Sequence, residues 1–393
     1  MANGKKDYDV VIIGSGITGL STAYHLRKAG IDHFIVLGER HNSETLKSPG
    51  LAMSGYLDNF TRFSHAHGKI AGGELWQFTR DAFQGLVAFC RAHHLNGFLR
   101  GPRLRLVTSD HELIEVEQAV SQLQDLGFPY ELHRRGEAGS IDWSLWGSRV
   151  LAIQDEGGEG GYFEDINPLL DQLGSHSSTS SAAWGRVKRV EAVSGGVRIL
   201  TENGTMTCEM VVLATNYGAR EVLPEMKNVL VPYVDQWISL HGFKEELPPD
   251  WPGLVFSANH GLEWGVVCDQ QTIRTGGARF LRPFAGTGSQ EEKLDSRVTS
   301  FLRSQVAHEF VAGQMSSVAE ERGGIGCRAC DEIPLVGPTT IDDRILFAGG
   351  YMGSGLAFGF YAGQCLVDFI RHGTCDKVPD LMLARRLRSL PGS

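Results

Sequence analysis

The sequence predicts an α/β fold, in which a parallel-sheet domain is joined to a second, α+β domain built on a mixed or antiparallel sheet. Three observations support this expectation. The chain opens on a buried strand, a glycine-rich turn and a helix, and a second unit of this kind lies near its end. Between them lie strand-like runs separated by hairpin turns, the pattern of an antiparallel sheet.

The first unit begins with Asp9–Ile13, an apolar and largely β-branched run that predicts a buried parallel strand. The run passes directly into Gly14-Ser-Gly-Ile-Thr-Gly19. A helix is predicted over about Ile17–Ala29, and Gly30 fits the position just past its end. Phe34–Leu37 predicts a second strand.

Each glycine of the turn has a separate role in holding a dinucleotide. Gly14 permits the tight turn, Gly16 lets the backbone approach a pyrophosphate, and Gly19 lets helix and strand pack closely. The helix N-terminus adds free N–H groups and a positive dipole end. Glu39 stands twenty residues after Gly19, where a carboxylate accepts ribose hydroxyls and repels the extra phosphate of NADP. The sequence therefore predicts a Rossmann-like domain that holds the ADP half of a dinucleotide.

Composition narrows the classes of function. The chain has 393 residues and a formal net charge of −9, which argues against a nucleic-acid partner because such proteins present basic surfaces. Seven cysteines, an odd number in a long chain, do not form the pattern of a disulfide framework. The first residues are too polar for a signal peptide, and no apolar run is long enough for stable membrane insertion. We therefore expect a cytoplasmic protein.

The middle of the chain supplies further helices and strands. Three strand-like runs lie within 187–216 and are joined by Gly-Gly and Asn-Gly turns. The last run ends in the apolar Val211–Thr215, which we expect to rejoin the first sheet. The other predicted elements are a helix over 73–94, a strand over 101–107, a helix over 112–126, antiparallel strands within 230–285 and a helix over 291–313.

The second strand–turn–helix unit occupies the C-terminal part. Asp331-Glu-Ile-Pro-Leu-Val-Gly-Pro338 precedes a predicted strand, Arg344–Ala348. Gly349–Gly359 is rich in glycine, and an apolar helix is predicted from there to Ile370. The N-terminus of that helix can direct N–H groups at a cofactor group that becomes negative on reduction, which favours reduction.

With both units in this order, the sequence resembles the D-amino-acid oxidase-like superfamily of FAD-dependent oxidoreductases, which includes glycine oxidase, sarcosine oxidase and D-amino-acid dehydrogenase. The resemblance covers nearly the whole chain and is sharpest at Gly14–Gly19 with Glu39, at Val211–Thr215, at Asp331–Pro338 and at Gly349–Gly359. It implies an FAD-binding domain made of 1–95, 161–229 and 318–393, with a substrate domain made of 96–160 and 230–317.

The resemblance also implies an activity. FAD is expected to be bound noncovalently, and the C–N bond of a primary or secondary amine is expected to be oxidised by hydride transfer to flavin N5. The substrate would be an amino acid or an N-substituted glycine, and oxygen or a quinone or protein carrier would accept the electrons. Two alternatives stay open: oxidation of a 2-hydroxy acid, and a flavin-binding subunit without turnover of its own.

The expected cofactor contacts come from the glycine pattern and from the resemblance. Ser48–Ala52 is similar to the segment that wraps the pyrophosphate and ribityl chain in the family, and Val187 stands at the position of a residue beside adenine. The resemblance and the pattern together imply FAD contacts at Gly14, Gly16, Ile17, Thr18, Gly19, Glu39, Arg40, Ser48, Gly50, Leu51, Ala52, Val187, Ala214, Thr215, Gly350, Gly353, Ser354, Gly355 and Leu356.

Five residues are candidates for the substrate side. Tyr351 and Met352 stand in the glycine-rich turn where the family lines the pocket above the flavin. Arg62 follows the wrapping segment, and Arg279 could bind an anionic group. Glu263 stands where sarcosine-oxidase-like members carry a lysine that activates oxygen, which weakens the expectation of direct use of oxygen.

The sequence departs from the family at two positions. Gly326 replaces the arginine that binds substrate carboxylates in many members, although Arg328 and Arg322 are close by. Gly324 replaces the cysteine through which some members hold FAD covalently. The lone Cys327-Arg-Ala-Cys330 is either a redox pair beside the flavin or two reduced thiols in a packed strand, and it is poor evidence for zinc. No metal site is predicted.

Overall fold

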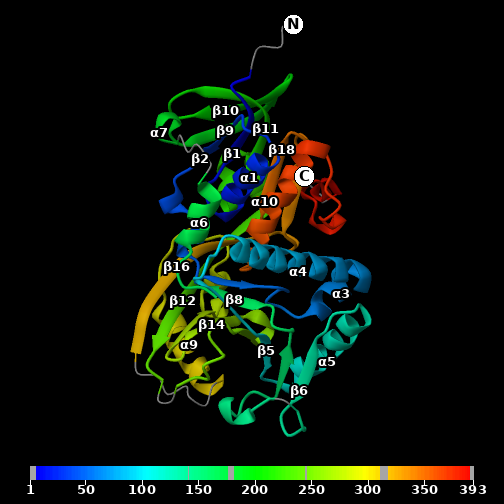
Figure 1. The fold of residues 1–393 in the computed structure, drawn as a ribbon, viewed down its shortest axis with the longest axis vertical. Coiled ribbons are helices and arrows are strands. Elements are labelled where there is room, and N and C mark those ends of the chain that lie inside the picture. The colour runs from blue at the N-terminus through cyan, green and yellow to red at the C-terminus, as the bar shows by residue number, and fades with distance from the viewer. Residues whose placement is uncertain (1–5, 140, 176–180, 244–245, 310–316, 390–393) are drawn as a thin grey trace.

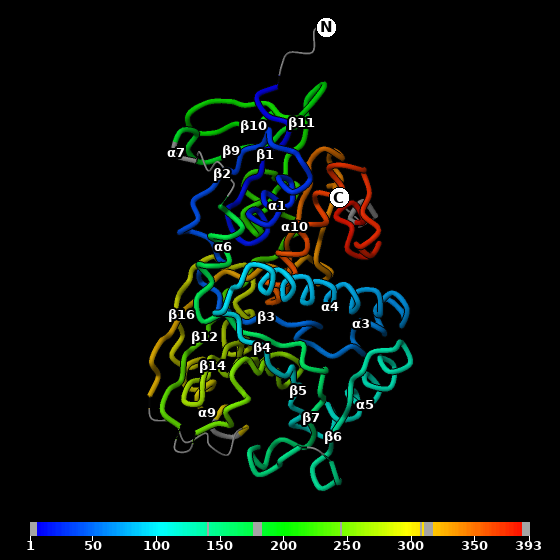
Figure 2. The backbone as a smooth tube through the Cα atoms, viewed as in Figure 1, coloured from blue at the N-terminus to red at the C-terminus, as the bar shows by residue number. Residues whose placement is uncertain are grey.

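The computed structural model describes residues 6–139, 141–175, 181–243, 246–309 and 317–389. Figure 1 shows two bodies, one above the other, with the long helix α4 (Lys69–Ala92) crossing between them. The chain trace in Figure 2 shows that the first and the last parts of the chain both belong to the upper body. The α/β class and the mixed second sheet expected from the sequence are confirmed.

The upper body is built on a seven-stranded sheet in the order β17–β18–β11–β1–β2, to which the hairpin partner β10 and then β9 are added beside β11. Val11 pairs with Val211 in parallel, so the third run of the middle segment does rejoin the first sheet. Its strands are β1 (Tyr8–Ile13), β2 (Phe34–Leu37), β9 (Val187–Val193), β10 (Gly196–Thr201), β11 (Thr205–Leu213), β17 (Leu335–Pro338) and β18 (Ile345–Gly349).

Two helices, α1 (Ile17–Lys28) and α10 (Gly355–His372), pack against each other beside this sheet. Their close approach depends on glycines, because a Cβ at Gly359 would stand 2.8 Å from Thr18 Oγ1 and one at Gly363 would stand 2.6 Å from Ser21 Cβ. The N-termini of both helices thereby reach the same edge of the sheet.

The lower body is built on an eight-stranded sheet in the order β16–β12–β15–β14–β13–β5–β7–β6. The pairing is antiparallel except between β13 and β5. Its longest pair, β12 with β16, runs from the lower body up to the junction. Its strands are β5 (Arg103–Val107), β6 (Glu131–Arg134), β7 (Ala152–Asp155), β12 (Leu230–His241), β13 (Val255–Ala258), β14 (Glu263–Asp269), β15 (Thr272–Gly277) and β16 (Ser317–Ala329).

A third sheet was not predicted. Strand β8 (Gly160–Phe163) lies between β3 (Leu51–Met53) and β4 (Phe98–Gly101). The strand predicted over 101–107 is confirmed for Arg103–Val107, which form β5, whereas Gly101 ends β4 in another sheet and the chain changes sheet at Pro102. Proline lacks the N–H that a ladder needs, which makes it a natural break.

The remaining helices cover the sheets or connect them. The helix predicted over 73–94 begins earlier, at Lys69, directly after Gly68. No helix within the described ranges is long and apolar enough to cross a membrane. These helices are α2 (Glu44–Lys47), α3 (Phe60–His67), α5 (Asp110–Asp125), α6 (Asn167–Gly174), α7 (Ser181–Trp184), α8 (Ala219–Val222) and α9 (Ser296–Glu309).

Candidate functional site

A cavity of about 880 Å³ lies where the two bodies meet. The upper body contributes the ends of β1, β2 and β11 and the starts of α1 and α10, whereas the lower body contributes β12, β14 and β16. The predicted residues that line it are Gly14, Gly16, Ile17, Thr18, Glu39, Ser48, Leu51, Val187, Ala214, Thr215, Tyr351, Met352, Gly353, Gly355 and Leu356.

The glycine turn has the geometry that a dinucleotide site requires. Gly14 has φ +117°, in the region that favours glycine, and a Cβ there would stand 2.7 Å from the carbonyl carbon of Ala214. A Cβ at Gly19 would overlap the backbone of Gly14, so this glycine permits the strand–helix contact. Gly16 lines the cavity, and a Cβ there would stand 3.0 Å from Thr45 Oγ1.

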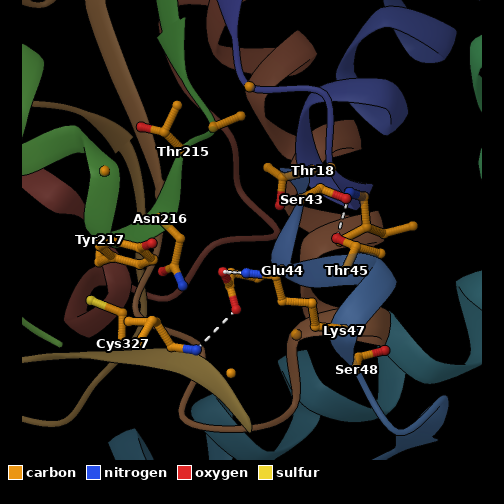
Figure 3. Close-up of a pocket in the computed structure, with 18 of the residues that line it drawn as sticks. Thr18, Ser43, Glu44, Thr45, Lys47, Ser48, Thr215, Asn216, Tyr217 and Cys327 are labelled. Carbon is orange, nitrogen blue, oxygen red and sulfur yellow. Dashed lines mark hydrogen bonds and ion pairs between the residues drawn. The ribbon is translucent and has the colours of Figure 1, made fainter. Parts of the chain in front are cut away.

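Several polar groups near the N-terminus of α1 are available to a phosphate-bearing ligand. The N–H of Ile17, in the first turn of α1, donates to Thr45 Oγ1 at 3.1 Å, so a neutral hydroxyl stands at the anion-binding end of the helix. The hydroxyls of Ser43 and Thr215 are buried and have no hydrogen-bond partner among the described residues. Figure 3 shows these side chains around the upper part of the cavity. Orphaned buried hydroxyls are rare, and a bound diphosphate would satisfy them.

The part of the cavity lined by Glu39 and Val187 fits a nucleoside. Glu39 lines the cavity where β2 ends, and its carboxylate accepts a hydrogen bond from Asn42 Nδ2 at 2.7 Å. Val187, Arg186 and Glu202 line the same cavity. The cavity thus contains both an acid and an apolar side chain of the kinds that bind adenosine in dinucleotide sites.

Six of the expected FAD contacts lie outside the residues that line the cavity. Arg40 points to the surface and binds Asp171 at 2.5 Å, while Gly19 is a packing residue. The N–H of Gly350 donates to Asn216 Oδ1 at 3.0 Å, which anchors the C-terminal turn. The others are Gly50, Ala52 and Ser354, of which Ser354 is the N-cap residue of α10.

Tyr351 and Met352 form the turn before α10. The hydroxyl of Tyr351 shares a hydrogen bond of 2.9 Å with Thr18 Oγ1, and burial raises the pKa of this phenol. Met352 has φ +51°, a strained conformation for a residue with a side chain. Tyr351 therefore links the turn before α10 to the first turn of α1.

The wall that faces them comes from the lower sheet. Tyr233, Asp235 and Trp237 alternate along β12 and line the cavity, and Trp264 joins them from β14. Glycines on the neighbouring strands make room for the rings. A Cβ at Gly326 would overlap the ring of Tyr233, and one at Gly276 would overlap that of Trp264.

Arg279 stands directly behind this wall. Its guanidinium carbon is 4.1 Å from the centroid of the Tyr233 ring. Within the described part of the chain, this guanidinium has no hydrogen-bond acceptor and no ion-pair partner within 4.0 Å. The preceding residue, Ala278, has φ +52°, so strained backbone directs the arginine to this place.

The ionisation of the wall follows from its burial. Burial raises the pKa of Asp235, and the nearby charge of Arg279 opposes that rise. Burial also raises the pKa of Tyr233 to about 12, so its hydroxyl keeps its proton at neutral pH. The wall thus presents a phenol donor and a guanidinium close to one carboxyl group.

Two substrate-side candidates lie elsewhere. Arg62 is half exposed and forms ion pairs with Asp58 and Glu332. Glu263 lies outside the lining, and its carboxyl accepts a hydrogen bond from Asn259 at 3.1 Å and contacts Glu309. Burial raises the pKa of both Glu263 and Glu309.

The cysteines of the CxxC sequence differ in their surroundings. Cys327 is buried against the cavity, and burial raises its pKa to about 12, whereas Cys330 is exposed. Both are free thiols. In the residues described by the structure, no cluster of three or more histidine, cysteine or acidic side chains could hold a metal ion.

The sequence analysis did not single out residues 44–47, which lie between the predicted contacts Arg40 and Ser48. Glu44, Thr45 and Lys47 all line the cavity, and Figure 3 shows Glu44 reaching toward β16. Burial raises the pKa of Glu44, although Ile325 N–H and Lys47 stabilise its charge. The local signal was the position of this segment a few residues after Glu39, and such a position fixes no side-chain direction.

These features define a dinucleotide-dependent oxidoreductase: a parallel sheet with a glycine turn, buried hydroxyls without partners, and a cavity between the upper and lower bodies. The chain belongs to the FAD dependent oxidoreductase (DAO) family, whose model matches residues 9–162 and 180–369. Its cofactor is FAD.

Known proteins resemble the chain along nearly its whole length. It is 22% identical to glycine oxidase of Bacillus licheniformis over 390 residues, which cover 93% of this chain and 94% of that protein. The crystal structure of glycine oxidase from Geobacillus kaustophilus has a TM-score of 0.77 at 16% identity and covers 97% of this chain and 99% of its own. L-proline dehydrogenase from P. horikoshii has a TM-score of 0.75 at 16% identity and 98% coverage of both chains.

Proposed function

We propose that this protein oxidises the C–N bond of a primary or secondary amine that carries a carboxylate, an amino acid or an N-substituted glycine. The observation that supports this most is the lower wall of the cavity beside the FAD site, where the Tyr233 hydroxyl is a hydrogen-bond donor and the guanidinium of Arg279, which lies outside the lining, stacks on the Tyr233 ring. Two of the similar proteins, glycine oxidase and L-proline dehydrogenase, have names that denote activities of this class.

In this proposal, 1–95, 161–229 and 318–393 form the FAD-binding domain, and 96–160 and 230–317 form the substrate domain. The glycine turn, the N–H of Ile17 and the hydroxyls of Ser43 and Thr215 hold the diphosphate, and Glu39 holds the ribose. FAD, when bound, supplies the acceptor for the hydride that leaves the substrate carbon.

The protein's own contribution is orientation and exclusion of water. Arg279 binds the substrate carboxylate in place of the family arginine, because Gly326 has no side chain and the ring of Tyr233 fills the space beside it. The hydroxyl of Tyr233 donates a second hydrogen bond to the same group. Trp264 and Met352 close the apolar sides of the pocket.

Anaerobic mixing of the purified holoprotein with sarcosine, glycine, proline, other amines and 2-hydroxy acids tests the proposal. We expect an amine with a carboxylate to bleach the flavin absorbance, and the matching amine without the carboxylate to bleach it more slowly. Readmission of air then separates an oxidase from a dehydrogenase. Bleaching by hydroxy acids alone, or by no compound at all, would contradict the proposal.

A further inference from the structure

Residues 44–49, which we call the strap, line one side of the FAD cavity without belonging to a sheet. The strap consists of α2 together with Ser48 and Pro49, and it connects β2 in the upper body to β3. Its side chains Glu44, Thr45 and Lys47 face the cavity, as Figure 3 shows. The contacts that hold the strap in place therefore affect the binding of a ligand in the cavity.

The side-chain tie of the strap to the upper body is the hydrogen bond from Ile17 N–H to Thr45 Oγ1, at 3.1 Å. That N–H belongs to the first turn of α1, where a diphosphate is expected to bind. A bound diphosphate would compete for this donor. The contacts between the strap and the lower body do not use the N–H groups at the start of α1. Cofactor binding therefore leaves these contacts in place.

Two of those ties come from residues of the cavity wall. The N–H of Ile325 in β16 donates to Glu44 Oε2 at 2.9 Å. The indole Nε1 of Trp237 in β12 donates to the carbonyl of Lys47 at 3.1 Å. These bonds fix Glu44 and Lys47 of the strap to β16, an edge strand of the lower sheet, and to its neighbour β12.

Two further ties come from residues that do not line the cavity. Arg274 Nη1 in β15 donates to the carbonyl of Pro49 at 3.0 Å. Its guanidinium carbon lies 5.1 Å from the Trp237 ring centroid and 5.3 Å from that of Tyr162, so stacking holds the donor in place. Glu292, on the segment leading into α9, forms an ion pair with Lys47.

We propose that the lower body holds the strap closed over FAD, and that Arg274 and Glu292 set the rate at which FAD leaves the protein. This inference rests on FAD binding in the cavity and not on the identity of the substrate. Arg274 has the larger effect, because a charge-assisted hydrogen bond from a stacked guanidinium outweighs a half-exposed ion pair.

The test measures FAD release from the holoprotein in the absence of substrate. After timed incubation, rapid desalting removes free FAD, and the flavin absorbance that remains with the protein gives the release rate. We expect Glu292→Gln to raise the rate about threefold, as loss of one exposed ion pair permits. Arg274→Met is expected to raise it about tenfold or more, with Arg274→Lys in between.

Lys69→Met is the matched control, because Lys69 forms a comparable surface ion pair with Asp125 at 2.8 Å outside the cavity lining. Its release rate should equal that of the unchanged protein. Glu292→Gln alters an exposed side chain, so it tests the inference even if Arg274→Met does not fold. Release at the original rate from both Glu292→Gln and Arg274→Lys would overturn the inference and leave the proposed activity untouched.

Discussion

Gly326→Ala tests whether the lower wall is closed to a side chain at this position. The new Cβ would stand 2.7 Å from Tyr233 Oη and closer still to two ring carbons. The ring is only 4% exposed, so it cannot simply swing into solvent. Overpacking of this kind costs about 1–3 kcal/mol. Displacement of the ring also weakens its stacking with Arg279, which is worth about 0.5–2 kcal/mol.

The two costs together predict a loss of about 1.5–5 kcal/mol in the free energy of unfolding. For a chain of this size, that loss lowers the unfolding temperature by about 2–6 °C. Thermal unfolding followed by flavin fluorescence measures it. Gly97→Ala is the control, because nothing lies within 4 Å of its added Cβ. Combining Gly326→Ala with Tyr233→Ala should cost less than the sum of the single changes. An unfolding temperature for Gly326→Ala equal to that of the control would refute the packing argument.

Three further changes probe the cavity and the lower body. Gly16→Val should yield folded but colourless protein, because the side chain enters the diphosphate space, while Gly97→Val should stay yellow. Lys47→Met should weaken FAD binding about fivefold by leaving the Glu44 carboxylate uncompensated, and adding Glu44→Gln should restore part of it, because the ion pair of Lys47 with Glu292 stays lost; titration with FAD measures both. Burial raises the pKa of Glu309, so the stability that its protonated form contributes is present at acidic pH and lost as pH rises through the raised pKa. Glu309→Gln should therefore unfold at a higher temperature than the unchanged protein at about pH 8 and lose that advantage near pH 4.

The sequence predicted the FAD end of the molecule well because its signals are local. A strand, three glycines at fixed spacing, a helix and an acid all fall within 9–39, and each has its role within a few residues of the next. The parallel strand ending at Leu213 was also predicted, since a buried strand in a parallel sheet is apolar throughout.

The lower wall was harder to predict because it depends on pairs that are distant in sequence. Tyr233 fits only because its partner on β16 is Gly326, and Trp264 fits only because its neighbour on β15 is Gly276. Strand register fixes such pairs, and a single sequence does not reveal register. The direction of Glu44, in α2, was missed because its partner Ile325 lies far away in the sequence, on β16.

The assembly of the seven-stranded sheet has a consequence for how the protein is made. β1 and β2 come from the start of the chain, β11 from its middle, and β18 with α10 from beyond residue 344. A ribosome delivers these pieces in that order, so β1 and α1 wait without their final neighbours until most of the chain has been synthesised. During that interval an apolar sheet edge is exposed to other chains. Free FAD can bind the complete cavity only after these pieces have assembled. The supply of FAD therefore acts late in biogenesis, and the lifetime of newly made apoprotein depends on flavin availability.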